Sequence, residues 1–574
     1  MDRTAWIVVA LCVVGLVVWE IYLVKQTPPR PAPVRIAPGQ TSPTTTPGIL
    51  GPSPTPVAEA TPSSGESAPG FAEKIETLRN SDVELRLTNR GGGIKEAVLL
   101  KQIAEKGQPV ILNSDKSAPI GALIEQPSSP TLAEFTASPE SDSAVRFEST
   151  TPEQIVIRKK FFFEKSPENK DDYVIEMDVD LENKGDKPYQ SSGYFVALGS
   201  AAPIHPRDYP SYTRLVWCID GRAKGIDVGW FGSSSGFLGL GLGQRAARPY
   251  YQENIAGAEW VAVSNQFFTT LMAPLTGKAT GAWGRRFDID YAPNQKLLAI
   301  EGALGMPGFQ LQPGQTYNAR FEIYAGPKLY HRLAQLPHNE AEVMDFGIFK
   351  IVCQLLLNFM NLLHSWFHDY GLAILALTTI IKLTLWPIQN KANRSMRQMA
   401  SLSPKIQELR DKYKDDPTRM NQEVMKLYKQ YGINPVGGCL PMMIQIPIFF
   451  GLFKMLGQAV ELRNAKFLWV KDLSQPDTVA HLPLLGWPIN IIPLCMAATQ
   501  IWLMAMTPKT GDPTQRRIAM FMPLIFLFIC YNFAAALALY YTAQNLFSIL
   551  QFYQNRRQPM PTLEKVAPAG KRKR

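Results

Sequence analysis

The sequence predicts a polytopic α-helical membrane protein of six spans that carries a large all-β domain on the outer side of the membrane. Residues 518–555 run for 38 positions without Asp, Glu, Lys or Arg, which no water-soluble domain tolerates. Between about 71 and 327, apolar and polar residues alternate, which is typical of antiparallel strands. Lys and Arg gather in three segments beside the apolar runs.

Average composition hides this division. The 574 residues include 59 Lys and Arg against 49 Asp and Glu, a net charge of +10, and 46% of them are hydrophobic. These values resemble a soluble protein, because the apolar residues are concentrated in a few runs. Only Cys218 of the six cysteines lies well inside the predicted β domain, and none forms a C-x-x-C pair, so a disulfide scaffold is excluded.

The N-terminal segments are predicted to be an anchor and a tether. Residues 1–25 contain an uncharged run long enough to cross a bilayer, which favours a signal-anchor, transmembrane helix 1. A cleaved signal peptide is the alternative, but no small-x-small cleavage site follows the run. Residues 26–70 are rich in Pro, Ser and Thr and cannot bury enough apolar area to fold, so they should form a disordered linker.

Residues 71–328 are predicted to form the β domain. Val83–Leu87 and Tyr173–Leu181 alternate between apolar and polar side chains, and turn signals such as Asn89–Gly93 and Asn183–Asp186 punctuate the runs. This pattern over roughly 250 residues indicates a large antiparallel β-sandwich.

Helical character begins near residue 329. Within 329–369, Phe346–His368 is predicted to be an amphipathic interfacial helix, with a full span as the open alternative. Residues 518–555 would be about 57 Å long as one helix, nearly twice the hydrocarbon core, so a hairpin turning near Asn532 is predicted. The remaining segments are transmembrane helix 2 at 370–389, a cytoplasmic helical hairpin at 390–435, transmembrane helix 3 at 436–457, a periplasmic loop at 458–487, transmembrane helix 4 at 488–507, a cytoplasmic loop at 508–517, transmembrane helices 5 and 6 at 518–533 and 534–555, and a basic cytoplasmic tail at 556–574.

The distribution of positive charge sets the orientation. Segments 391–429, 508–517 and 556–574 carry net charges of +5, +2 and +6. The positive-inside rule places all three in the cytoplasm. Six spans then put both termini in the cytoplasm and the β domain outside it.

An isolated charge lies deep in the second predicted span. Lys382 is the only charged residue between Asp369 and Lys391, and an uncompensated charge at such a depth costs roughly 3 kcal/mol on insertion scales. Lys382 should therefore face the bundle interior or a water-filled cavity, with Thr378 one turn away and Gln389 two turns toward the cytoplasm. A structural lysine paired with a partner helix is the alternative. The absence of Asp or Glu deep in another predicted span favours the hydrated cavity.

Two basic regions face the cytoplasm in this topology. The segment 390–435 should fold as two antiparallel helices, with Asp416 and Pro417 as a cap and a first helical residue. Its basic faces dock a partner such as the ribosome or are simply solvated, and the tail binds anionic phospholipid or ribosomal RNA or only anchors the topology. The candidate docking residues are Lys405, Arg410, Lys412, Lys571, Arg572, Lys573 and Arg574.

Signals of enzymatic chemistry are weak. Residues 232–236 fit G-x-S-x-G, but the glycine-rich stretch that follows is unsuited to the helix of a nucleophile elbow. The sequence contains neither a phosphate-binding G-x-x-x-x-G-K-[ST] motif nor an H-E-x-x-H motif, and its histidines are scattered. We predict no enzymatic activity, no metal and no other cofactor.

The C-terminal half carries motifs of a known family. Residues 434–441 read N-P-V-G-G-C-L-P and residues 445–449 read Q-I-P-I-F, which resembles the third-span signature of the YidC/Oxa/Alb membrane protein insertases. The resemblance covers 329–557 well and the β domain more loosely. It implies the Gram-negative YidC type, whose periplasmic domain is a β-supersandwich and whose five-helix insertase core encloses a groove open to cytoplasm and lipid. Further matching motifs are Val460–Arg463, Lys471–Ser474, Phe521–Pro523 and Leu539–Tyr541.

The resemblance implies an inner-membrane protein that integrates and helps fold other membrane proteins through a hydrated, positively charged groove. Its partners would be nascent membrane proteins, the Sec translocon, the ribosome and anionic phospholipid. The groove would be lined by Lys382, Thr378, Gln389 and Gln445. Residues contacting client helices would be Pro441, Ile444, Ile448, Phe449, Phe526, Tyr540 and Tyr541.

Two positions depart from the family pattern. Lys382 stands where the family usually has arginine, and Ala534–Ala536 stand where Pro-Ser-Gly is usual. The rival hypothesis is a solute transporter or channel with an extracytoplasmic sensing domain. Transporters typically contain internal repeats, and we find none in this sequence. An anchored periplasmic sugar-binding protein would leave Lys382 unexplained.

Overall fold

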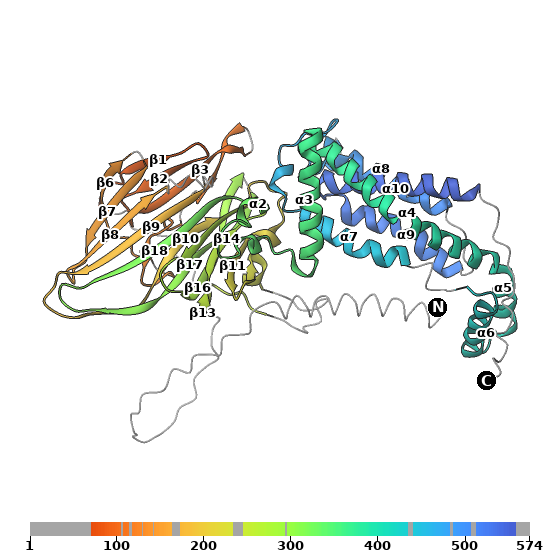
Figure 1. The fold of residues 1–574 in the computed structure, drawn as a ribbon, viewed down its shortest axis with the longest axis horizontal. Coiled ribbons are helices and arrows are strands. Elements are labelled where there is room, and N and C mark those ends of the chain that lie inside the picture. Colours follow the sequence, from red (N-terminus) through yellow and green to blue (C-terminus); the bar gives the residue numbers. More distant parts are fainter. Residues whose placement is uncertain are drawn as a thin grey trace, which may run out of the picture.

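The computed structural model shows an elongated molecule, with an all-β domain at one end and a helical bundle at the other (Figure 1). The predicted signal-anchor, the linker and residues 558–574 of the tail lie outside the described residues. The described residues are 71–557 apart from 105–106, 114–116, 129, 142, 164–172, 234–244, 293–294, 434–439, 483–485 and 507–512.

The described part of the β domain is built from strands in chain order β1 (Ile75–Arg79), β2 (Val83–Thr88), β3 (Gly93–Ile103), β4 (Pro109–Leu112), β5 (Leu123–Ile124), β6 (Thr136–Ser141), β7 (Ala144–Thr150), β8 (Ile155–Phe162), β9 (Val174–Asn183), β10 (Tyr189–Ala201), β11 (Arg214–Ile219), β12 (Arg222–Asp227), β13 (Tyr251–Ala258), β14 (Trp260–Ser264), β15 (Phe268–Pro274), β16 (Ala279–Ala292), β17 (Gln295–Leu311) and β18 (Thr316–Pro327). They form sheets of order β1-β2-β3-β4, β13-β16-β17-β10-β5 and β12-β11-β14-β15-β18-β9-β8-β7-β6. Paired neighbours are antiparallel, as the sequence predicts.

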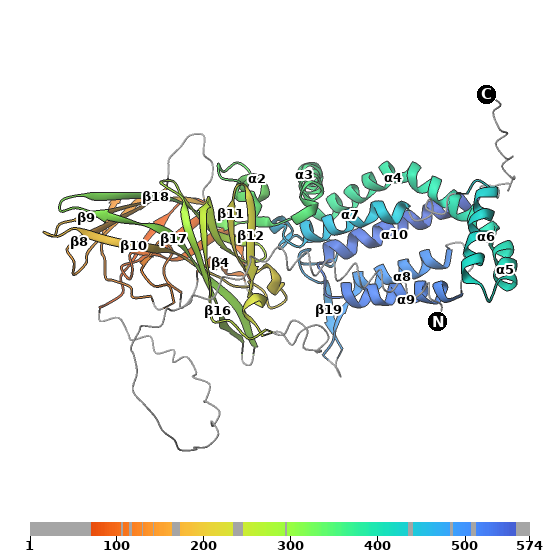
Figure 2. The same cartoon turned by 90° about the horizontal axis from the view of Figure 1, so that it is seen from below.

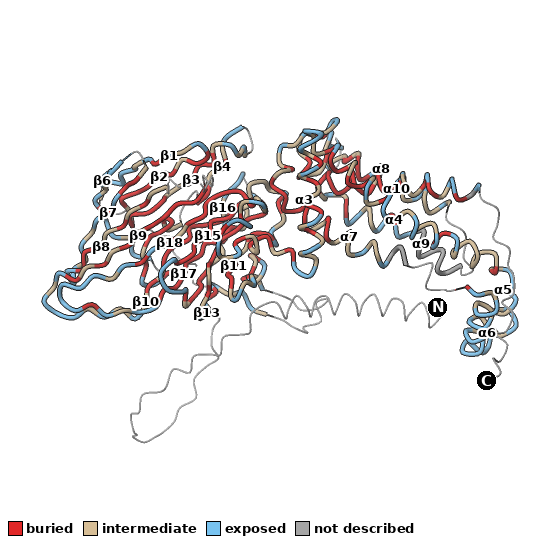
Figure 3. Tube along the Cα trace, viewed as in Figure 1, coloured by how far each residue is buried: buried red, intermediate tan, exposed pale blue. Residues whose placement is uncertain are grey.

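The period-two pattern explains these strands. In β2, Val83, Leu85 and Leu87 are buried, whereas the polar residues between them are half-buried. The hairpin to β3 turns at Gly91 and Gly92, whose φ angles of 71° and 54° favour glycine. Buried positions follow the strands through the interior of the domain (Figure 3), which confirms the predicted all-β domain.

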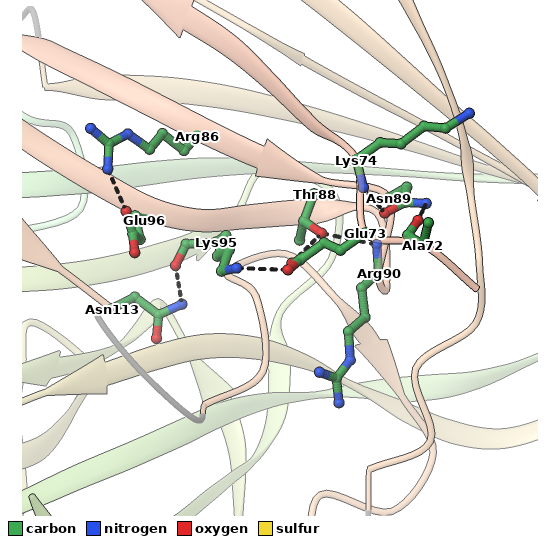
Figure 4. A network of polar contacts seen from close by, with 10 residues as sticks. All are labelled: Ala72, Glu73, Lys74, Arg86, Thr88, Asn89, Arg90, Lys95, Glu96 and Asn113. Carbon is green, nitrogen blue, oxygen red and sulfur yellow. Dashed lines mark hydrogen bonds and ion pairs between the residues drawn. The ribbon is translucent and has the colours of Figure 1, made fainter. Parts of the chain in front are cut away.

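A polar network fastens the start of the β domain to the β2–β3 hairpin. Glu73 accepts a hydrogen bond from Lys95 Nζ at 2.7 Å. Asn89 accepts from the Lys74 backbone N–H at 2.8 Å and donates to the Ala72 carbonyl at 3.2 Å (Figure 4). The domain is therefore held in place from Ala72 onward.

Lys159 on β8 is a fully buried cation. Its ammonium donates to the carbonyl oxygens of Gly91 at 2.5 Å and Gly121 at 3.1 Å, and it lies 4.5 Å from the centre of the Phe135 ring. Burial lowers the pKa of Lys159 from 10.5 to about 7. The lysine thus links β8 to the turns at Gly91 and Gly121. Burial makes its charged form less stable than it would be in water.

We expect the stability of the β domain to rise with pH between about 7 and 10.5 because the unfolded chain, whose lysines keep their ordinary pKa, binds more protons in that window. Lys159→Met should reduce this slope by about 1.4 kcal/mol per pH unit in the middle of the window. Urea unfolding of the full chain, followed at several pH values, measures the slope.

Part of the slope should survive in that variant, because burial also lowers the pKa of Lys328 to about 7. The matched control is Lys160→Met, which removes the neighbouring lysine on the same strand. Lys160 is only half-buried and pairs with Glu140 at 2.8 Å. Equal slopes in wild type and Lys159→Met would contradict the prediction.

The described helical part contains α2 (Tyr330–Leu333), α3 (Lys350–Phe367), α4 (Tyr370–Ser401), α5 (Ser403–Lys412), α6 (Pro417–Gln430), α7 (Leu440–Leu456), α8 (Ile491–Met506), α9 (Pro513–Cys530) and α10 (Ala535–Arg556). A short hairpin of β19 (Thr478–His481) and β20 (Pro488–Asn490) precedes α8. Helix α3 lies across the end of the bundle that faces the β domain, whereas α4, α7, α8, α9 and α10 run along its length (Figures 1 and 2).

Two of the described helices are long and apolar enough to cross a membrane on length and composition, Gly347–Phe367 and Tyr370–Ser401. Three shorter apolar helices are Met443–Leu456, Ile491–Met506 and Phe521–Cys530. The predicted number of six spans is therefore not established by the helices alone.

The second predicted span continues beyond its predicted end. Helix α4 passes residue 389 and Pro387 and ends at Ser401, so the first part of the predicted hairpin segment belongs to it. The Arg397 guanidinium donates to the Asn555 carbonyl at 2.7 Å, which holds this extension against α10. Two helices follow as predicted, and Asp416 caps α6 by accepting from the Arg419 N–H at 3.0 Å.

The predicted turn near Asn532 falls between the end of α9 at Cys530 and the start of α10 at Ala535. The residue at the N-cap, Ala534, has no side chain that could cap the helix. Instead, the N–H groups of Ala535 and Ala536 donate to the carbonyls of Gln475 and Leu473 at 2.9 and 3.0 Å. The small alanine side chains let the loop that contains Leu473 and Gln475 approach the start of α10. The helix therefore begins here without the Pro-Ser-Gly sequence that the resemblance led us to expect.

Side chains of the β domain contact the residues that follow α7 and those that precede α3. Lys328 Nζ donates to Gln458 Oε1 at 3.0 Å, and Gln266 Nε2 donates to the Gly457 carbonyl at 2.8 Å, both in buried surroundings. Arg214 on β11 forms an ion pair with Asp345, just before α3. These contacts place the β domain against the end of α7.

Candidate functional site

The candidate site lies where α4 and α10 meet. Lys382 on α4 is 4% exposed, and its ammonium donates a hydrogen bond to Ser548 Oγ on α10 at 2.8 Å. Within the described part of the chain, that hydroxyl is the sole hydrogen-bond or ion-pair partner of the ammonium. Lys382 thus pairs with a partner helix, but through a neutral group.

Neutral polar side chains continue this contact along α10. Tyr540, Gln544, Ser548, Gln551 and Asn555 recur every three or four residues and so share one face of the helix. All are at least half-buried, although the helix is largely apolar. A row of this kind inside a bundle must be satisfied by its neighbours.

Both neighbouring helices supply partners. Gln445 Nε2 on α7 donates to Gln544 Oε1 at 3.1 Å. Asn390 Oδ1 on α4 accepts from Gln551 Nε2 at 2.7 Å and from Asn555 Nδ2 at 3.1 Å. We use the name polar seam for Lys382, Asn390, Gln445, Tyr540, Gln544, Ser548, Gln551 and Asn555.

Two residues predicted to line the groove lie apart from the seam. Thr378 is buried, and its hydroxyl donates to the Ile374 carbonyl of its own helix at 2.7 Å. Gln389 is half-buried, whereas its neighbour Asn390 occupies the position that faces α10. Sequence reasoning missed Asn390 and most of the α10 face, although the spacing of polar residues from Tyr540 onward was a readable signal.

Several predicted client-contact residues form an aromatic cluster at the junction of α7, α9 and α10. The Phe449 ring centre lies 5.9 Å from that of Phe526 and 5.4 Å from that of Tyr541. Phe526 and Tyr541 are 5.3 Å apart, and both Tyr540 and Tyr541 are buried. These rings pack the helices against one another.

The exposed apolar surface lies on other residues of the same helices. On α7, Ile444 and Ile448 are half-buried, while Ile446 is exposed. Pro441 also belongs to α7, and its side chain is outside the described set. Phe528 on α9 is 85% exposed. The exposed large apolar residues of α9 are Phe521, Met522, Leu524, Ile525, Phe528 and Ile529.

The predicted docking residues differ in their exposure and in their contacts within the chain. Lys405 on α5 donates to the Tyr431 hydroxyl at 2.5 Å and lies 4.7 Å from the centre of that ring, so it is tied to the end of α6. Arg410 is half-buried and Lys412 is exposed. Lys571, Arg572, Lys573 and Arg574 lie outside the described residues.

No group of three or more His, Cys, Asp and Glu residues in the described ranges could hold a metal ion. The fold and the polar seam define the class: a bundle of apolar helices with a row of polar side chains inside it, joined to an all-β domain.

Comparisons with known proteins identify the family within that class. A family model described as 60Kd inner membrane protein matches residues 362–561, and one described as YidC periplasmic domain matches residues 76–359. The membrane protein insertase YidC of Syntrophus aciditrophicus (strain SB) is 30% identical over 97% of this chain and 100% of its own length. That of Nitratidesulfovibrio vulgaris (strain DP4) is 30% identical over 86% of this chain and 89% of its own. The chain belongs to the YidC family of membrane protein insertases.

A solved structure described as an active YidC insertase with the first transmembrane domain resolved aligns at 18% identity over 85% of this chain and 95% of that chain. Its TM-score is 0.34, so the assignment rests on the sequences. The predicted family and insertase function are thereby confirmed. The protein is a non-enzymatic insertase of the inner membrane whose β domain is periplasmic and whose substrates are nascent membrane proteins.

Proposed function

We propose that this insertase receives hydrophilic client segments in a groove that opens along the polar seam. Lys382 carries the proposal. A lysine ammonium can donate three hydrogen bonds, yet a single neutral hydroxyl is its described partner. The cost of burying this charge is therefore poorly offset, and entry of water or of a polar client segment lowers it.

The seam amides support the same step. Gln445 pairs with Gln544, and Asn390 pairs with Gln551, in both cases across two helices. Each amide can therefore exchange its partner for a client backbone or side chain without being left unsatisfied. The apolar helix of the client moves into lipid along the exposed surface of α7 and α9, driven by about 25 cal/mol per Å² of apolar area buried. No nucleotide is required for this step.

The proposal includes six spans, namely the predicted signal-anchor followed by α4, α7, α8, α9 and α10. Helix α3 lies at the periplasmic interface, because it crosses the end of the bundle and exposes one apolar face. Both termini are then cytoplasmic. The exposed residues of that face are Ile351, Leu355, Leu362 and Trp366.

The partners are also part of the proposal. The Sec translocon would share clients with this chain at the apolar surface of α7 and α9. The ribosome and anionic phospholipid would meet the basic hairpin and the tail through phosphate contacts that weaken with salt. Because Lys405 is tied to Tyr431, Lys412 and the tail are the better candidates for such contacts. Ribosome co-sedimentation across a salt series, with the chain truncated after Met560, separates docking from a topology anchor.

Reconstitution tests the function. Purified protein in proteoliposomes should integrate a single-span client with a short charged tail in the absence of nucleotide. Protease protection of the translocated tail measures integration, and liposomes without protein are the control. Solute flux without client integration would instead support the transporter hypothesis.

A further inference from the structure

A tight turn between α7 and α8 presents two large apolar side chains to the outside. Phe467 and Val470 exchange both backbone hydrogen bonds, at 3.0 and 2.8 Å, so Leu468 and Trp469 occupy the tip of a two-residue turn. Leu468 is 73% exposed and Trp469 is 46% exposed. We call residues 466–471 the Leu-Trp turn.

The backbone of the tip is strained. Leu468 has a φ angle of 51°, in the left-handed region that glycine and asparagine favour and where a bulky residue costs about 1 kcal/mol. A leucine so exposed regains little of that cost by packing within the chain. The strain therefore calls for an explanation outside the folded chain, such as a surface that the leucine contacts.

The Leu-Trp turn lies level with the outer ends of two apolar helices. The Phe467 ring packs against Gly371 in the first turn of α4. Trp469 Nε1 donates to Asp477 Oδ2 at 3.2 Å, and the same oxygen accepts from the Ile492 N–H, in the first turn of α8, at 2.7 Å. Both helices begin at the end of the bundle that faces the β domain (Figure 2). The start of an apolar span marks the edge of the hydrocarbon region, where tryptophan is enriched.

Charge and neighbouring elements fit a lipid surface. Lys466 and Lys471, on either side of the tip, are both exposed, so an apolar point stands between two cations. At the end of α3, just before α4, Trp366 and Phe367 are also exposed. A tip that binds a protein would not need a lysine on each side. If the tip entered a bilayer, the two lysines would lie at the depth of the lipid phosphates.

We propose that the Leu-Trp turn is a membrane-interface anchor that inserts Leu468 and Trp469 into the periplasmic leaflet while Lys466 and Lys471 contact lipid phosphates. Insertion would compensate the strain at Leu468 by burying the exposed apolar surface of Leu468 and Trp469 in lipid. The anchor and the neighbouring end of α3 would together fix the depth of the bundle in the periplasmic leaflet. This inference depends on the membrane location of the family and not on the polar seam.

Fluorescence quenching tests the anchor in the full chain. A fluorescent amino acid is incorporated at position 468, and the protein is reconstituted in liposomes of phosphatidylethanolamine and phosphatidylglycerol. We expect quenching by lipids with a nitroxide on the acyl chain and little quenching by aqueous iodide. The matched control is position 75, which is also exposed but lies on β1, away from the bundle, and should show the opposite pattern. Iodide quenching at 468 equal to that at 75, or protection from both reagents by a second copy, would overturn the proposal.

A second variant separates anchoring from a local structural role. Asparagine tolerates a positive φ, so Leu468→Asn should leave the unfolding temperature in detergent unchanged or higher. In liposomes, lipid quenching of a fluorophore at position 469 should fall at least twofold in that variant. If Leu468 served only the local fold, the unfolding temperature would drop and the quenching would stay the same.

Discussion

Replacing Lys382 with alanine should lower the rate of client integration by about tenfold or more. The charge-assisted hydrogen bonds that the ammonium offers a polar segment are worth about 1.5–3 kcal/mol, and the other described members of the polar seam are neutral. Lys382→Arg should retain integration, because the contact with Ser548 needs one charged donor. The two-pronged geometry of a guanidinium is neither required nor harmful there. The assay is integration of a charged-tail client into proteoliposomes.

Lys382→Met is the sharper variant, because methionine keeps most of the apolar stem and removes the charge. If the charge acts on the client, this variant should integrate clients as poorly as Lys382→Ala while its unfolding temperature stays near that of wild type. Ser548→Ala removes the partner and keeps the charge, so it should integrate clients far better than either. Wild-type rates in the methionine variant would exclude a positive groove.

Gly371→Ala should destabilise the protein by about 3 kcal/mol, the upper part of the usual range for overpacking. A Cβ atom at this position would overlap the Phe467 ring. Helix propensity acts in the opposite direction, since alanine is favoured over glycine by about 1 kcal/mol within a helix. The overlap is the larger effect, so the unfolding temperature in detergent should fall.

A double-mutant cycle tests the cause. In a Phe467→Ala background the obstructing ring is gone, and Gly371→Ala should then be neutral or mildly stabilising. The sign of the effect therefore reverses between the two backgrounds. Destabilisation of the same size in both would show that the ring is not responsible.

The sequence predicted the parts of the fold that follow from local pattern. Alternation in residues 83–87 identified β2, and the uncharged run of 518–555 identified a helix pair with a break near Asn532. The sequence did not predict the extension of α4 to Ser401. The contact that holds it joins Arg397 to Asn555, and residues so far apart in the sequence leave no local pattern. Contacts such as that of Gln266 with Gly457 produce no periodic pattern in the sequence. The interface between the β domain and the bundle therefore could not be predicted.

Of the polar seam, the sequence identified Lys382, Gln445 and Tyr540, the last two only through the family resemblance. Lys382 stood out because a lone charge in an apolar run is rare. Ser548, Gln544 and Asn390 carry no charge, and only their spacing could have singled them out. The hydroxyl of Thr378 bonds to its own helix, an outcome that periodicity cannot distinguish from a contact across helices. A single hydroxyl is the described partner of Lys382, and one ammonium donor is enough for that contact.

The way α10 begins has a consequence for the biogenesis of the insertase itself. Its first turn is closed by the carbonyls of Leu473 and Gln475, which come from the loop between α7 and α8. That loop is made earlier, and in the proposed topology it would have to be translocated before α10 arrives. A chain that threaded α7 or α8 the wrong way round would leave the N–H groups of Ala535 and Ala536 unmet at the membrane edge, at about 1–3 kcal/mol each. In the proposed topology, the first turn of α10 would therefore be satisfied only when α7 and α8 are correctly inserted.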